Sequence, residues 1–67
     1  MRTQKDAPDR EERRRELVEW RKRLALNSVE AGNLLHYSSS SIRKWERGEQ
    51  TVPDDVYRIV KEDNDEG

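Results

Sequence analysis

The sequence predicts an all-α protein, a single small domain built from four short helices. Apolar residues recur at spacings of three and four, which is the helical period. Cap-forming residues, Gly and Pro divide the chain into four such segments, and no stretch alternates as a strand does. Only 30% of residues are hydrophobic and 43% are charged, so the core is small and the placement of its few apolar side chains carries the prediction.

The two ends of the chain are expected to lie outside the folded part. Residues 1–8 are polar and end in Pro8, so we expect a flexible N-terminal arm. The acidic residues 62–67 are expected to form a frayed, disordered tail. The folded domain is therefore predicted to span residues 9–61.

The first helix is predicted to begin at Asp9 and to reach about Leu26. Asp9 can accept hydrogen bonds from the free amides of the first turn. Leu17, Trp20 and Leu24 form one apolar stripe. Glu and Arg alternate along the segment, so we expect ion pairs within the helix at i,i+3 and i,i+4 spacings.

The second helix is predicted to run from Ser28 to about Leu35. Asn27, with Glu30 three residues later, is a capping signal. A turn at residues 36–38 follows. The residues expected to face inward are Val29 or Ala31, Leu34 and Leu35.

The third and fourth helices are separated by a short loop. Ser38 caps a helix that is expected to reach about Arg47, and Gly48 ends it in a left-handed conformation. Pro53 and the acidic pair after it suit the first turn of the fourth helix. The expected inward residues of these two helices are Ile42, Trp45, Val56, Ile59 and Val60.

Charge is unevenly distributed along the chain. The net charge is −1, yet residues 10–47 hold ten basic and six acidic residues, a local balance of +4. Residues 48–67 hold two basic and seven acidic residues, a balance of −5. Because the local field governs phosphate binding, the basic part fits a nucleic-acid surface. Solvated helix faces remain the alternative.

Composition also argues against several classes of protein. With no Cys and one His, we expect no disulfide and no metal site. No nucleophile–base pair or Gly-rich loop is present, so we expect neither enzyme activity nor a cofactor. So small a core leaves no room for a small-molecule ligand. The chain has no long apolar run and no signal peptide, so we expect a cytoplasmic protein.

The second and third predicted helices fit the plan of a helix-turn-helix. The outward stripe of the third helix is polar and holds Ser39, Ser40, Arg43, Lys44 and Arg47. An arginine can donate two hydrogen bonds to guanine, and a lysine can reach the same edge or a phosphate. The alternative is an ordinary solvated helix face.

The same residues resemble a known family. Leu24-Ala25-Leu26, Glu30-Ala31, Ser38, Pro53 and the run Ile42-Arg43-Lys44-Trp45-Glu46-Arg47-Gly48 resemble the Xre/Cro-like phage repressors, over about residues 17–60. A narrower resemblance is to phage anti-CRISPR-associated regulators. The resemblance implies a lambda-repressor-like domain of four or five helices. It also implies a transcriptional repressor that binds double-stranded DNA and is associated with the nucleoid of a bacterial or phage-infected cell.

The resemblance assigns roles to twelve residues. It implies base reading by Ser39, Ser40, Arg43 and Lys44. It implies phosphate contacts from Asn27, Ser28, Ser38, Arg47, Gln50 and Thr51. It also implies a structural ion pair between Arg21 and Glu46.

Several positions depart from the family pattern. Ala31 and Gly32 stand where the family often has Leu and Ala, so Gly32 weakens the second helix but permits a close approach of helices. His36 stands where the family often has Gly, so it must adopt an unusual backbone angle or the turn differs. Asp54 makes a minor-groove contact from that loop doubtful.

One domain of this size makes too few base contacts to select one site in a genome, so we expect a homodimer on a palindromic operator. The dimer contacts could come from the fourth helix, through Tyr57, Ile59 and Val60, or from Val18 and Trp20 of the first. The rival functions are a protein-interaction module (an antitoxin or an adaptor) and a DNA-architectural or recombination factor.

Overall fold

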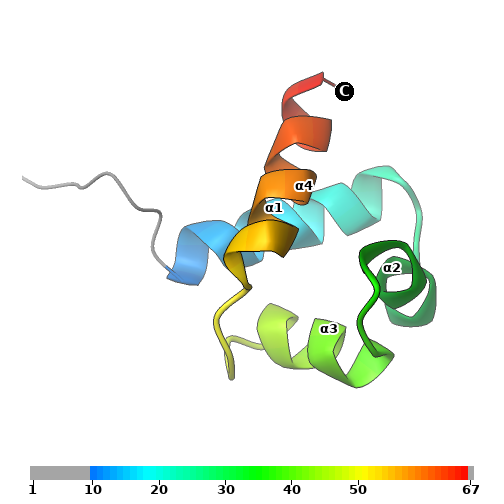
Figure 1. The fold of residues 1–67 in the computed structure, drawn as a ribbon, viewed down its shortest axis with the longest axis vertical. Coiled ribbons are helices and arrows are strands. Elements are labelled where there is room, and N and C mark those ends of the chain that lie inside the picture. The colour runs from blue at the N-terminus through cyan, green and yellow to red at the C-terminus, as the bar shows by residue number, and fades with distance from the viewer. Residues whose placement is uncertain (1–9, 67) are drawn as a thin grey trace, which may run out of the picture.

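The computed structural model describes residues 10–66, and in this range the protein is all-helical with no strand. The helices are α1 (Arg10–Arg23), α2 (Ser28–Leu35), α3 (Ser39–Glu46) and α4 (Asp54–Glu66) (Figure 1). The predicted all-α class and the four helices are confirmed. The expected arm at residues 1–8 and the expected cap Asp9 lie outside the described residues. Within the described range, no helix combines the length and the apolar character needed to cross a bilayer.

The predicted caps of α2 and α3 are confirmed. The Asn27 side-chain oxygen accepts from the backbone N–H of Glu30 at 2.8 Å, and the Glu30 carboxylate accepts from the backbone N–H of Asn27 at 2.9 Å. This reciprocal pair is a capping box. Ser38 Oγ accepts from the backbone N–H of Ser41 at 3.2 Å. Each cap satisfies amides that have no partner within the helix.

The core is one cluster to which all four helices contribute. Its nine buried residues are Leu17, Trp20, Ala31, Leu35, Ile42, Trp45, Val52, Val56 and Val60. α1 packs against α3 and α4, and α2 packs against α3. The loop between α3 and α4 adds Val52, which is 1% exposed, so this loop is fixed to the core.

Three apolar residues that the sequence places inside are exposed instead. Leu24, Leu34 and Ile59 are 39%, 57% and 50% exposed. α1 ends at Arg23, so Leu24 lies in the turn that follows. Leu34 and Ile59 each lie one position from the buried row of their helix, and one residue rotates a side chain by about 100° around the axis. Conversely, Trp20 and Val60, two of the candidate dimer contacts, are buried in the core, so neither is exposed to a second chain.

α4 is longer than the sequence predicts. It continues to Glu66, so the expectation of a disordered tail from residue 62 is wrong for residues 62–66. Trp20 Nε1 donates to the Asp63 carboxylate at 2.9 Å, and Asn64 donates to the backbone carbonyl of Glu16 at 3.1 Å. These contacts with α1 hold the last turns of α4 in place.

The turn between α2 and α3 brings two backbone segments close together. His36 has a φ of 65°, the unusual angle that its position requires. Gly32 is buried, and a Cβ on it would overlap the backbone carbonyl oxygen of Tyr37. The backbone that approaches this glycine closely is therefore that of the turn, and not that of another helix as expected.

Gly32→Ala should destabilise the domain, although alanine is the better helix former by about 1 kcal/mol. The added methyl group must displace the backbone of the turn, at a cost of about 1–3 kcal/mol. Asn33→Ala is the control, because Asn33 is exposed on the same helix. Urea unfolding measures both variants. An equal or higher stability for Gly32→Ala would contradict the packing described.

Candidate nucleic-acid interface

The outer face of α3 carries polar side chains without internal partners. Ile42 and Trp45 form the buried face of the helix. On the opposite side, Ser40 and Arg43 are exposed and Lys44 is partly exposed. Within residues 10–66, these three side chains make no hydrogen bond or ion pair. Two cations on this face are therefore free to meet an external anion or a base edge.

Ser39, the fourth predicted base reader, lies in the first turn of α3 and is partly buried. The side chains of Ser39 and Ser40 are short. They cover little of the helix backbone in the N-terminal half of α3. The helix has no acidic residue in this first turn, so its positive dipole end is not neutralised by its own side chains.

The segment after α3 folds back onto the end of the helix. The Lys44 carbonyl accepts from the backbone N–H groups of Glu49, at 2.9 Å, and Gln50, at 3.4 Å. Gly48 has a φ of 81°, as expected for the residue that ends the helix. The turn brings the backbone of Gln50 to the C-terminal end of α3, and the side chain of Gln50 is exposed.

Two of the predicted phosphate ligands in this segment already have partners. Arg47 Nε lies 3.1 Å from the Glu49 carboxylate. Thr51 Oγ1 accepts from Arg10 Nε at 3.2 Å. Both pairs are exposed, and an exposed ion pair contributes only about 0–1 kcal/mol, so a phosphate could replace Glu49 at Arg47.

The predicted phosphate site at the start of α2 is filled by the protein itself. The Glu30 carboxylate accepts from the backbone N–H of Asn27, and the Asn27 oxygen caps the first turn. The negative charge of Glu30 opposes a phosphate at this position. Ser28 is partly buried beside it, and Ser38 is used as the cap of α3.

The predicted ion pair between Arg21 and Glu46 is present. Arg21 Nε and Nη2 lie 2.5 Å and 2.9 Å from the two carboxylate oxygens of Glu46. Arg21 Nη1 also donates to the Leu26 carbonyl at 3.0 Å. The hydrogen bond that Arg21 donates to the Glu46 carboxylate raises the pKa of Arg21, which keeps its guanidinium group charged. It fixes the C-terminal end of α3 to α1.

Further arginines of α1 perform a role that the sequence analysis missed. Arg10 donates to the Gly48 carbonyl at 3.2 Å, Arg13 to the Val52 carbonyl at 2.7 Å and Arg14 to the Glu46 carbonyl at 3.3 Å. They satisfy carbonyls at the end of α3 and in the loop that follows. These arginines continue the buried stripe of Leu17 and Trp20 toward the N-terminus, and that spacing was a signal that could have revealed them.

Arg13 makes the most contacts among these arginines. Its Nη2 lies 2.5 Å from the Asp54 carboxylate, and its guanidinium lies 5.3 Å from the ring centre of Tyr57. Arg23 pairs with Asp63 at 2.7 Å. The expectation that the charges of α1 pair within the helix is therefore wrong for Arg13 and Arg23, which reach α4.

Comparisons of the chain with protein-family models, with curated proteins and with solved structures found no match. Within residues 10–66, no group of three or more His, Cys, Asp or Glu side chains could hold a metal ion. The function is therefore argued from the geometry of the outer face of α3.

Arg13→Gln should lower the free energy of unfolding by about 1–2 kcal/mol, because the Val52 carbonyl loses a donor and Asp54 loses its partner. The Arg13 side chain is only 14% exposed, so water replaces these contacts poorly. Arg15→Gln is the control, since Arg15 is exposed on the same helix. Equal stability losses in urea unfolding would show that the loop contacts contribute nothing.

Alkaline pH should weaken the domain partly through Tyr57. Desolvation, together with a hydrogen bond at 3.0 Å to the Glu12 carboxylate, raises the pKa of its phenol. The folded state favours the neutral phenol, so this stability is present below the unfolded-chain value of about 10 and is lost as pH rises through the higher folded value.

Thermal unfolding between pH 8 and pH 12 measures this loss. Tyr57→Phe should show a smaller fall in melting temperature at high pH than the parent protein. Identical pH profiles would assign the alkaline loss to other groups, such as Tyr37 and Lys61, whose pKa values are also raised.

Proposed function

We propose that the protein is a sequence-specific DNA-binding transcriptional regulator, a phage or mobile-element repressor of the lambda-repressor-like type. In this proposal α2, the turn and α3 form a helix-turn-helix, and α3 enters the major groove. The observation that carries the proposal is the outer face of α3, where Arg43 and Lys44 have no partner within the described residues.

The chemistry of this face suits base edges. Arg43 would donate two hydrogen bonds to O6 and N7 of a guanine, and Lys44 would reach a neighbouring base or a phosphate. Ser39 and Ser40 are small enough to let the helix approach the bases, and their hydroxyls pair with either base type. Trp45 and Ile42 anchor the opposite side of the helix in the core.

The loop after α3 would contact the DNA backbone. Gln50 is exposed at its turn, and Arg47 and Thr51 are exposed beside it. Ser38 would contribute from the start of α3. Asn27 and Ser28 are the weakest of the proposed phosphate ligands because Glu30 shares their helix end.

Rigid mounting of α3 supports recognition. The Arg21–Glu46 pair and the arginine–carbonyl contacts hold the C-terminal end of the helix and its loop before any ligand arrives. Pre-organised binding surfaces lose less entropy on association. Because α3 is held in place before DNA binds, less of the binding free energy would be lost to ordering the helix.

The regulator is proposed to act as a homodimer. Two or three base contacts per domain, each contributing about 1–3 kcal/mol, cannot select one operator, and a twofold dimer doubles them. Trp20 and Val60 are buried, so such a dimer would use other exposed residues. Bound at a promoter, the dimer would exclude RNA polymerase.

Selection of binding sites from random duplex DNA at physiological salt tests the proposal, with the stoichiometry of the complex measured alongside. We expect a palindromic consensus bound by two chains. Arg43→Ala and Lys44→Ala should each relax the preference at particular positions. Arg47→Ala should weaken binding to all sequences and reduce the salt slope by about one unit.

Arg58→Ala is the matched control for these variants. Arg58 is an exposed arginine of α4, away from α3, and should leave the consensus and the salt slope unchanged. Failure to enrich any sequence would reject the proposed function. A consensus that survives Arg43→Ala intact would reject the base-reading role of Arg43.

A further inference from the structure

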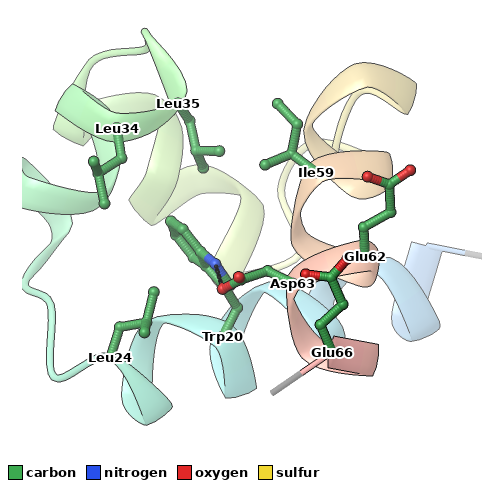
Figure 2. Close-up of a pocket in the computed structure, with 8 residues that line it drawn as sticks. All are labelled: Trp20, Leu24, Leu34, Leu35, Ile59, Glu62, Asp63 and Glu66. Atoms are coloured by element: carbon green, nitrogen blue, oxygen red, sulfur yellow. Dashed lines mark hydrogen bonds between the residues drawn. The ribbon is translucent and has the colours of Figure 1, made fainter.

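A second surface of the protein is an open, mostly apolar groove of about 390 Å³ between α1, α2 and α4 (Figure 2). Its floor and walls are formed by Trp20, Leu24, Leu34, Leu35 and Ile59. One side is bordered by three acidic residues of α4, Glu62, Asp63 and Glu66. No residue of α3 lines it, so this groove is separate from the proposed DNA-binding face.

The groove exposes a cluster of apolar side chains to water, which is energetically unfavourable. The described residues expose four large hydrophobic side chains, and Leu24, Leu34 and Ile59 are three of them. They come from three different parts of the chain and converge on one hollow (Figure 2). Single exposed apolar residues are ordinary, but a convergent group marks a surface that binds another molecule.

The acidic residues along one side of the groove indicate that the bound molecule is positively charged. Glu62 and Glu66 are exposed and have no ion-pair partner within residues 10–66. These carboxylates lie near the C-terminus of α4, which is the negative end of the helix dipole, and the last turn of the helix has no basic residue to offset them. A cationic partner would relieve this unfavourable arrangement.

We propose that this groove binds a basic amphipathic helix of a partner protein. Its apolar side chains would enter between Leu34 and Ile59, and its Lys or Arg side chains would meet Glu62 and Glu66. This is the helix-in-groove mode of recognition, in which anchors at i, i+3, i+4 and i+7 fill an apolar groove. The proposal goes beyond DNA binding and does not depend on it.

The charge pattern favours a partner protein over a second copy of this chain. A symmetric pairing of two grooves would bring the acidic borders of both copies to one interface, and like charges there are unfavourable. The partner-free cations of α3 lie outside the groove. If the protein binds DNA through α3, the partner helix can bind at the same time.

A titration of the ¹⁵N-labelled full chain with a synthetic peptide tests the proposal. The probe is an 18-residue helical peptide with Leu at positions i, i+3 and i+4 of each seven-residue repeat and Lys at the other positions. We expect saturable one-to-one binding, with chemical-shift changes at the Trp20 indole N–H and at the backbone amides of Leu34 and Ile59. A peptide with Glu in place of every Lys should not bind.

Matched variants separate the groove from the rest of the surface. Ile59→Ser should weaken peptide binding on the order of tenfold. Val29→Ser is its control, since Val29 is 55% exposed, compared with 50% for Ile59, but does not line the groove. The double variant Glu62→Gln/Glu66→Gln should weaken binding and reduce its salt dependence, whereas Glu19→Gln on α1 should do neither.

Three results would overturn the proposal. The first is the absence of saturable binding. The second is binding that spreads over acidic residues outside the groove or is insensitive to Ile59→Ser. The third is that the free protein self-associates in sedimentation experiments and that Ile59→Ser abolishes this self-association. In that case a second copy of the chain would occupy the groove. Site selection on DNA is a separate measurement, so its outcome leaves this test unaffected.

Discussion

The arrangement of this protein depends on one requirement, that the carbonyl groups at the end of α3 and in the loop after it find hydrogen-bond donors. The arginines of α1 meet it. Arg10, Arg13 and Arg14 donate to three carbonyls between residues 46 and 52, and Arg21 holds the Glu46 carboxylate. A core of nine residues is small for a domain, and these contacts join α1, α3 and the loop where apolar packing alone is sparse.

This internal use of arginine changes how the charge of the protein should be interpreted. The excess of positive charge in residues 10–47 comes largely from α1, yet most of its arginines are paired with carbonyls or carboxylates of the same chain. The cations available to an external anion include Arg43 and Lys44 on α3. A local charge balance therefore overstates the number of cations that are free to meet an external anion.

The two candidate binding surfaces differ in chemistry and in position. The outer face of α3 is polar and cationic, and the groove between α1, α2 and α4 is apolar with an acidic border. Both depend on the same core: Trp45 anchors α3, and Trp20 forms the floor of the groove while its indole N–H binds Asp63. A single small cluster of buried side chains thus positions both the surface proposed to bind DNA and the surface proposed to bind a protein helix.

The sequence by itself determined the features that depend on neighbours along the chain. The caps at Asn27 and Ser38, the left-handed turn at Gly48 and the inward residues Ile42 and Trp45 follow from local hydrogen bonding and helical spacing. The Arg21–Glu46 pair was predicted from the family resemblance, and its geometry is present.

Only the tertiary structure decided which side of each helix is covered and where the charges pair. Leu34 and Ile59 are exposed because the packing angle selects one of two adjacent apolar rows. The end of α4 is ordered because Asp63 and Asn64 meet α1, more than 40 residues away in the chain. Contacts of such separation leave no local signal, since hydrophobic period and capping residues report only on neighbours within a few turns.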